Sequence, residues 1–118
     1  MVGKAGFGVD FKLRIIKKMA IQIESEILSQ TVQGWGYANV DVFAKEQAKN
    51  ILQQKIAYYQ SRIDFFEQKY VLKFSEFCDE FSSIKNHSIT EKEDDSIIWE
   101  TSLDVVESYE KDLIALSL

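Results

Sequence analysis

The spacing of apolar residues predicts helices along most of the chain. The clearest run recurs at steps of three and four residues, the period of one face of an α-helix: Phe43, Ala44, Ala48, Ile51, Leu52, Ile56, Tyr59, Ile63, Phe66 and Tyr70. Asn39 or Asp41 can cap its start. A helix over 41–69 would be about 43 Å long at about 1.5 Å per residue, longer than a compact domain of this size is wide. We therefore expect part of it to contact a second copy of the chain or a partner.

The first segment gives two competing patterns. Apolar residues alternate with polar ones from Val9 to Ile15, as in a strand, whereas Ile16, Met19, Ala20, Ile23 and Ile27 follow helical spacing. We expect a helix over about 11–33, and the pattern leaves open whether residues 9–16 form a short extended arm or strand. Gly34 and Gly36 are expected to end this helix, because glycine adopts the left-handed conformation that commonly follows one.

Two further helices are expected in the second half. A short one should carry Phe74, Phe77, Cys78, Phe81 and Ile84 on one stripe that is core or interface. After a loop over 85–90, a last helix should begin between Glu91 and Ser96, where acidic residues suit the positive end of the helix dipole. The fold class predicted is all-α, a four-helix domain with one long central helix.

Composition narrows the class of protein. The chain has 118 residues, the size of one domain, and contains no proline and a single cysteine. One cysteine cannot form an intrachain disulfide, so a reducing compartment is expected. The N-terminus lacks the apolar run of a signal peptide, and no stretch approaches the roughly 20 apolar residues of a membrane span. We expect a cytoplasmic protein without a membrane partner.

Charge is distributed unevenly along the sequence. Residues 1–18 carry five bases against one acid, residues 19–73 are balanced, and residues 74–118 carry twelve acids against three lysines. This polarity suggests a basic segment for a polyanion and an acidic one for a basic protein surface, or simply solvated faces. The single domain over 1–118 thus divides into a basic arm and first helix (1–35), a long dimerising helix (39–70) and acidic partner-binding helices (73–118).

The candidates for catalysis and metal binding are few. Cys78 and His87 are the only possible nucleophile and imidazole base, and a cysteine on an apolar face is more often a small hydrophobe than a reactive thiol. The acidic run 91–95 could gather oxygen ligands but lacks the central glycine of a calcium loop. Phosphate-binding loops, serine elbows and zinc motifs are missing from the sequence. We expect no enzyme, no metal and no cofactor.

The same acidic run allows two non-catalytic interpretations, an N-terminal charge cap of the last helix or a protein-contact patch. Trp99 follows it closely and either anchors an interface or belongs to the core. The candidate partner-binding residues are Glu91, Glu93, Asp94, Asp95, Trp99 and Glu100. A weaker nucleic-acid signal comes from the bases of the first helix, which could contact two or three phosphates: Lys12, Arg14, Lys17 and Lys18.

Two stretches resemble known antitoxins. Residues 36–48, GYANVDVFAKEQA, are similar to the turn and second helix of ribbon-helix-helix antitoxins, in which a glycine-aromatic turn leads into a capped, dimerising helix. The blocks EQKY (67–70), FSEF (74–77) and EKEDDSIIWE (91–100) resemble small helical prokaryotic proteins, many of them antitoxins of TumE-like toxins. After the tyrosine, Val71 stands where this resemblance implies a glycine, so we expect a different turn there.

The resemblance implies a non-catalytic antitoxin that neutralises a toxin with a basic surface. Its amino-terminal part would support a homodimer and operator binding, and its acidic carboxyl-terminal part would bind the toxin. The dimer contacts are expected from Phe43, Ile51, Tyr59 and Ile63 on the long helix. The alternative is a self-associating helical structural or adaptor module without a toxin.

Overall fold

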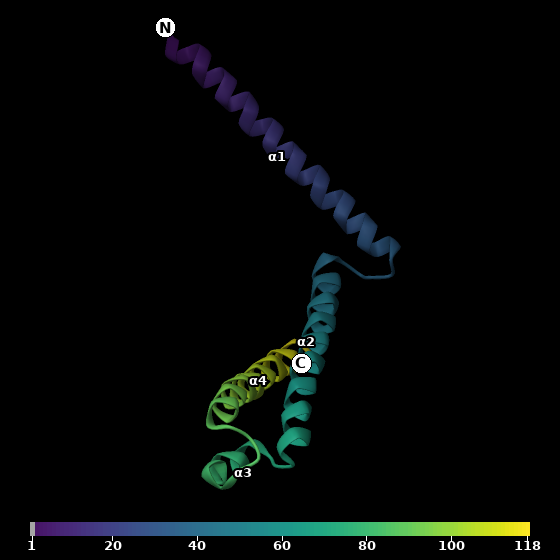
Figure 1. Cartoon of the computed structure of the whole chain (residues 1–118). Helices are drawn as coiled ribbons and strands as arrows, with labels where there is room; N and C mark the ends of the chain where they lie inside the picture. Colours follow the sequence, from purple (N-terminus) through teal and green to yellow (C-terminus); the bar gives the residue numbers. More distant parts are fainter. Residues whose placement is uncertain (1) are drawn as a thin grey trace. The chain divides into compact units, whose positions relative to one another are not determined.

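The computed structural model describes residues 2–118, with side chains from Gly8 onward, and consists of helices (Figure 1). In chain order these are α1 (Val2–Gly34), α2 (Val40–Tyr70), α3 (Phe74–Asp79), the 3-10 turn η1 (Phe81–Ser83) and α4 (Ile89–Leu116). Residues 2–118 contain no strand, so the predicted all-α class is confirmed. The alternative of an extended arm over 9–16 is wrong, because these residues continue α1 without a break.

The chain divides into two compact units, Met1–Glu46 and Gln47–Leu118, whose boundary falls within α2. The prediction of a single domain over 1–118 stays a prediction. No helix among residues 2–118 combines the length and apolar character that a membrane crossing requires.

The first unit is dominated by α1, whose side chains are exposed throughout residues 9–28. The helix ends where the sequence predicts, through paired hydrogen bonds from Tyr37 N to Val32 O and from Gly36 N to Gln33 O, both 3.0 Å. Gly36 has φ +98°, the left-handed conformation that closes this kind of helix end. Glycine is therefore favoured at position 36, because it adopts this backbone conformation without strain.

The start of α2 confirms Asn39 as the cap. Its Oδ1 accepts a hydrogen bond from Val42 N at 2.8 Å, which satisfies one of the free amides of the first turn. Phe43 packs against two aromatic rings of the preceding turn, Trp35 at 5.8 Å and Tyr37 at 5.1 Å between centroids. The short connection between α1 and α2 is thus held by local contacts.

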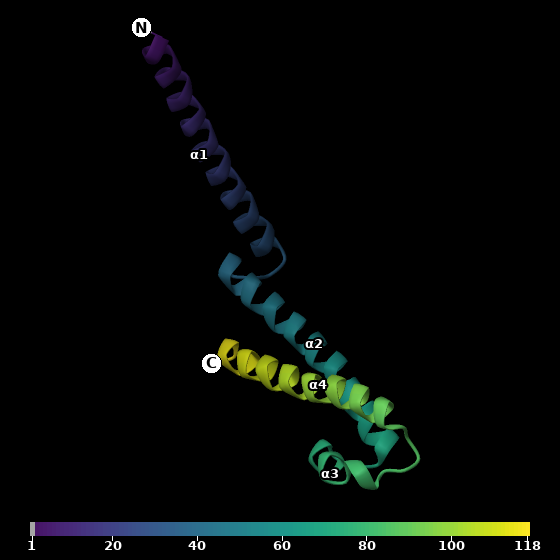
Figure 2. The same cartoon turned by 60° about the vertical axis from the view of Figure 1, so that its left-hand side comes forward.

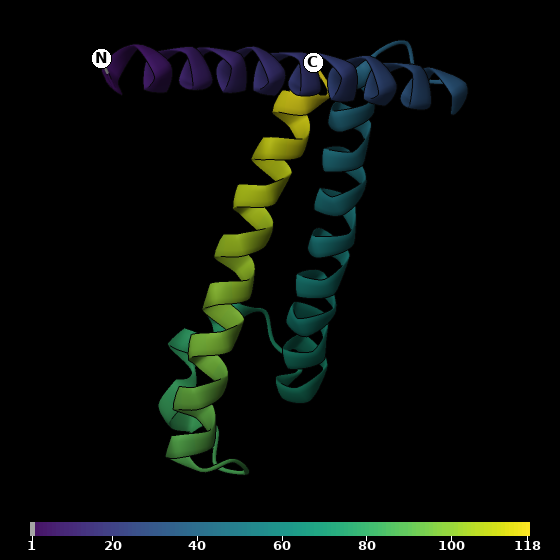
Figure 3. The same ribbon diagram turned by 90° about the horizontal axis from the view of Figure 1, so that it is seen from above.

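The second unit is built on two long helices. The part of α2 in this unit and α4 lie side by side in opposite directions, and α3 lies where α2 ends and α4 begins (Figure 1, Figure 2 and Figure 3). Their facing sides form one core, which consists of Ile63, Phe66, Tyr70, Phe77, Trp99 and Val106. Trp99 is at its centre, with Phe66 stacked at 5.6 Å and Phe77 at 5.1 Å between ring centroids.

The last helix begins at Ile89, slightly earlier than predicted. Ser88 supplies the cap, since its Oγ accepts a hydrogen bond from Glu91 N at 3.1 Å. The charged run 91–95 therefore occupies the first turns of α4, where its carboxylates also favour the helix dipole.

The turn after α2 contains a strained residue. Val71 has φ +57°, which is unfavourable for a β-branched side chain, and it is largely exposed. This is the position at which the resemblance implies a glycine, and the backbone takes the conformation that glycine adopts at low cost.

Candidate functional site

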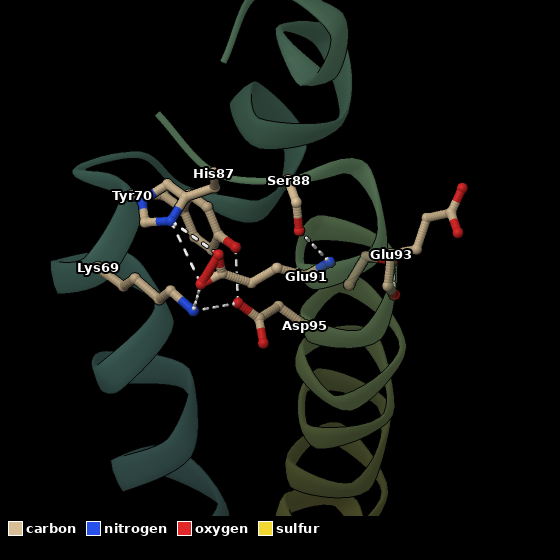
Figure 4. A network of polar contacts seen from close by, with 8 residues as sticks. Lys69, Tyr70, His87, Ser88, Glu91, Glu93 and Asp95 are labelled. Atoms are coloured by element: carbon tan, nitrogen blue, oxygen red, sulfur yellow. Dashed lines mark hydrogen bonds and ion pairs between the residues drawn. The ribbon is translucent and has the colours of Figure 1, made fainter. Parts of the chain in front are cut away.

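A network of polar side chains joins the end of α2 to the start of α4 (Figure 4). Lys69 Nζ contacts Asp95 Oδ2 at 2.6 Å and Glu91 Oε1 at 2.9 Å. Tyr70 Oη donates to the same Asp95 oxygen at 2.6 Å. Two consecutive residues of α2 are therefore bound by two carboxylates one helical turn apart on α4, which fixes the two helices against each other.

His87 extends the network into the loop before α4. Its Nδ1 lies 3.1 and 3.3 Å from the two carboxylate oxygens of Glu91, and its ring packs edge-on against Tyr70 at 5.0 Å between centroids. Figure 4 shows Lys69 and His87 approaching Glu91 from one side, while Glu93 points away from the cluster. The loop is thus held by the same carboxylate that binds α2.

These contacts shift the proton affinities of three groups. Hydrogen bonds to Asp95 first, and then to Glu91, raise the pKa of Lys69. Burial first, and then the hydrogen bond to Asp95, raises the pKa of Tyr70. The hydrogen bonds from Lys69 and then His87 lower the pKa of Glu91. Each shift favours the form that makes the contact and so strengthens the attachment of α4 to α2, and we call this network the clamp.

Lys92 forms a second polar feature on α4. It is buried, and its Nζ donates to Phe81 O at 2.6 Å and Ile84 O at 2.8 Å while lying 4.4 Å from the centre of the Phe81 ring. These carbonyls belong to the first residue of η1 and to Ile84, the residue that follows η1. The lysine therefore attaches the irregular segment after α3 to α4.

The structure separates the predicted acidic residues into two groups. Glu91 and Asp95 belong to the network within the chain, whereas Glu93, Asp94 and Glu100 are exposed. Beyond them, Asp104 and Glu107 are exposed on the same helix. Glu93, Glu100, Asp104 and Glu107 recur at steps of seven, four and three residues, which places them on one outer face of α4. We call this stripe the acidic face; Ile97 lies within it, 64 % exposed.

Trp99 does not belong to this face, because its side chain is fully buried. Its proposed role as an exposed anchor is wrong, and the alternative that it is core is confirmed. It occupies the inner side of α4 with Lys92 and Val106, seven residues before and after it. Its indole Nε1 has no hydrogen-bond partner within the part of the chain that the structure describes.

The four residues expected to form dimer contacts have different surroundings and do not form one exposed face. Ile63 is buried in the core of its own chain and Tyr59 packs against that core, so neither lies on a free face. Ile51 lines an apolar groove of about 540 Å³ between α2 and α4, with Leu52, Tyr109 and Leu116. Phe43 packs against its own turn. The side of α2 that carries Tyr59 and Ile63 is thus already used within the chain.

The remaining candidates are surface residues. Lys12, Arg14, Lys17 and Lys18 are all exposed on α1. Cys78 is also exposed, which corrects its expected place on the apolar stripe, because α3 turns Phe77 and not its neighbour into the core. Partial burial, and then Glu100 and Asp79, raise the pKa of the Cys78 thiol, which disfavours the reactive thiolate. Among residues whose side chains are described, no group of three or more His, Cys, Asp or Glu could hold a metal ion.

Sequence reasoning missed Lys69, Tyr70 and Lys92 as functional contacts. A signal existed for Lys92, because it falls seven residues before Trp99 on the inner stripe of its helix. Compared with known proteins, the chain matches no family model, no curated protein and no solved structure.

Proposed function

We propose that this chain is a non-catalytic, antitoxin-like protein that binds a toxin with a basic surface and neutralises it by occlusion. The observation that carries the proposal is the acidic face of α4, where Glu93, Glu100, Asp104 and Glu107 stand on one side of a rigid helix. Of these, only Glu107 makes an ion pair within residues 8–118, at 3.3 Å to Lys111. The face therefore offers carboxylates that intramolecular partners leave largely uncompensated.

The clamp described above supports this role. Glu91 and Asp95 bind Lys69 and thereby fix α4 on α2, so the acidic face is presented on a preorganised surface. A preorganised surface binds more tightly because less conformational freedom is lost on association. Charge attraction would speed the encounter with a basic partner, and Ile97 supplies an apolar contact that would slow its release.

The test begins with a pull-down of the tagged chain from its host at low and high salt, followed by binding kinetics with the recovered protein. We expect one small basic protein that is lost at high salt. Replacing Glu93 and Glu100 by Lys should lower its association rate at least about tenfold at low salt. The matched control, Glu76→Lys with Asp79→Lys on α3, changes net charge equally and should leave the rate near that of the wild type.

Two results would contradict the proposal: recovery of the chain alone at both salt concentrations, or equal kinetics for the two charge-reversed variants. Binding of operator DNA through Lys12, Arg14, Lys17 and Lys18 is a secondary part of the proposal, tested by the salt dependence of binding to DNA from upstream of its gene.

A second candidate function is a self-associating helical module without a toxin. One observation favours it, namely the exposed apolar side chains that run along α1. Such surfaces on soluble proteins usually mark contacts with another macromolecule.

A further inference from the structure

A line of side chains along α2 alternates between apolar residues and bases. It lies within the second unit and recurs at steps of four and three residues: Ile51, Lys55, Tyr58, Arg62 and Phe65. The second unit leaves its three apolar side chains more than half exposed, between 51 % and 59 %. We call this line the α2 strip.

Two grooves between α2 and α4 border the α2 strip. The groove of about 540 Å³ already described is lined by Ile51 and Lys55, and a second groove of about 480 Å³ is lined by Arg62 and Phe65. The two bases are seven residues apart, so both grooves open on the same side of α2. The α2 strip therefore offers apolar depressions along roughly 20 Å of helix.

The two bases of the α2 strip have aromatic neighbours but no acid. Lys55 Nζ lies 5.7 Å from the centre of the Tyr109 ring, and Arg62 donates to Tyr58 Oη at 3.1 Å. Neither base forms an ion pair with a residue whose side chain the structure describes. Arginine and tyrosine are also the residues that often contribute most binding energy at protein interfaces. The strip therefore fits a surface that brings carboxylates to both bases.

The acidic face of α4 has the complementary pattern. With its isoleucine included, it also recurs at steps of four and three residues: Glu93, Ile97, Glu100, Asp104 and Glu107. Among the described helices, only α4 carries exposed carboxylates seven residues apart, which is the spacing of Lys55 and Arg62. Within one chain the acidic face points away from α2, because α4 turns the side with Trp99 to α2. The carboxylates must therefore come from a second copy.

The charges of α1 do not match the α2 strip. Its acids, Asp10, Glu24 and Glu26, are not spaced by seven residues, and residues 12–18 include four bases. A second α2 does not match it either, because four bases would meet at an interface without an acid. Charge complementarity therefore selects the acidic face as the occupant.

An antiparallel pairing of the two lines places both bases against acids. When Arg62 faces the partner subunit's Glu100, Lys55 faces the partner subunit's Glu107. The match follows because the two bases and the two acids are each seven residues apart. The same register sets the Tyr58 hydroxyl group against a third carboxylate of the acidic face, to which it can donate.

The apolar residues decide the direction of the two helices. In the antiparallel register Phe65 packs on the partner subunit's Ile97, and Ile51 lies along the aliphatic stem of the partner subunit's Lys111. The parallel pairing that overlaps the two lines fully sets carboxylates against Ile51 and Phe65, and Lys55 against the partner subunit's Ile97. The antiparallel arrangement leaves fewer charges without a partner.

We propose that the α2 strip binds the acidic face of a second copy, with the two helices antiparallel and Arg62 against the partner subunit's Glu100. Two different surfaces meet, so each contact leaves one strip and one acidic face free, and association is open-ended or closes as a ring. The inference does not rest on the toxin, although a toxin bound to the acidic face would compete with this contact.

The first experiment measures the mass of the full chain by analytical ultracentrifugation across a concentration series, at low and high salt. One variant is Lys55→Glu with Arg62→Glu, and the other is Glu100→Lys with Glu107→Lys. The control is Lys73→Glu with Lys85→Glu, which matches the charge change of the first variant at exposed lysines outside the strip. Circular dichroism of each variant checks that it is folded.

At low salt we expect wild type and control to form species larger than a dimer, which dissociate at high salt. Each of the other two variants alone should associate at least about 100-fold more weakly, because like charges then face each other. An equimolar mixture of these two variants should associate again, because each reversed surface meets its complement.

The second experiment tests direction by disulfide formation in a Cys78→Ser background under mild oxidation. Phe65→Cys with Ile97→Cys should give covalent multimers, because the antiparallel register brings these positions together. Phe65→Cys with Glu107→Cys should stay monomeric, since residues 65 and 107 meet only in the parallel pairing.

Three outcomes would overturn the inference. A wild-type mass that stays monomeric at low salt would show that another segment of the chain, or a different acidic protein, occupies the strip. A mixture of the two reversed variants that does not associate would show that these faces do not meet. Multimers from the pair at residues 65 and 107, and none from the pair at 65 and 97, would show parallel helices. Capture of a toxin by a monomeric wild type would overturn this inference and leave the proposed function intact.

Discussion

Two long helices of this chain have opposite surroundings. On α4, Trp99, Ser102 and Val106 are buried against α2 and α3, whereas residues 9–28 of α1 are all exposed. Helices of such length are stabilised mainly by packing of an apolar face and only weakly by intrinsic propensity. The comparison teaches that α4 obtains this packing within the second unit, whereas the first unit supplies none to residues 9–28 of α1.

The largest loss of stability is expected from removing the side chain at the centre of the second unit's core. Trp99→Ala should lower the free energy of unfolding by about 3–5 kcal/mol, because it leaves a large cavity among aromatic rings. Ile21→Ala, at an exposed position on α1, should change it by less than about 0.5 kcal/mol. Urea denaturation followed by tryptophan-independent circular dichroism measures both. Similar losses for the two variants would show that the units do not differ in this way.

Lys92 tests whether the packed unit also depends on a buried charge. Lys92→Ala should cost about 2–3 kcal/mol, since it leaves the carbonyls of Phe81 and Ile84 without their donor. Lys111→Ala removes an exposed lysine from a surface ion pair and should cost no more than about 0.5 kcal/mol. The same denaturation measurement applies. A Lys92→Ala loss as small as that of Lys111→Ala would contradict the role assigned to the buried ammonium group.

The turns that follow α1 and α2 give a smaller and opposite pair of effects. Gly36→Ala should destabilise the chain by about 1 kcal/mol, because φ +98° is unfavourable for alanine although its Cβ would touch nothing. Val71→Gly should stabilise it by roughly 0.5–1 kcal/mol, since the strain at φ +57° outweighs the entropy that glycine adds to the unfolded chain. Midpoints of thermal unfolding measure both, and a destabilising Val71→Gly would show that the valine side chain is needed.

The smallest effect is expected when pH is lowered and Glu91, a member of the clamp, becomes protonated. The pKa of Glu91 is lowered from its ordinary value of 4.5, so its contribution is present above pH 4.5 and is lost as pH falls through the folded-state pKa. The pKa values of Lys69 and Tyr70 are raised from 10.5 and 10.0, so their contributions are present below those values and are lost as pH rises through the folded-state pKa values. Urea midpoints from pH 3 to 7 should fall less steeply for Glu91→Gln than for wild type. Glu93→Gln, outside the clamp, should follow the wild type.

The sequence predicted the features that depend on the spacing of apolar residues along a helix and on the residue types at turns. The helix of residues 41–69 was found almost to the residue, and both Asn39 and Gly36 have the roles that their residue types indicate. Residues 9–16 were ambiguous, because exposed apolar residues on several sides of a helix also satisfy an alternating pattern.

The candidate site could be predicted only in part, because sequence distance hides which charges pair. Asp95 and Glu93 look alike in the acidic run, yet one is bound by Lys69, 26 residues earlier, and the other is exposed. Trp99 was left open between an interface anchor and the core, and Lys92 was grouped with the acidic run, although their common stripe with Val106 indicates the core. Pairing between helices is set by their relative rotation, which no local pattern contains.

The position of α1 ahead of the packed unit has a consequence for synthesis on the ribosome. Eighty-four residues separate Gly34 from Leu118, which at about 5–20 residues per second takes roughly 4–17 seconds to translate. During this interval α1 is complete while the core around Trp99 does not yet exist. Once α1 has left the ribosome, its exposed apolar residues are therefore available to chaperones before the core around Trp99 can form.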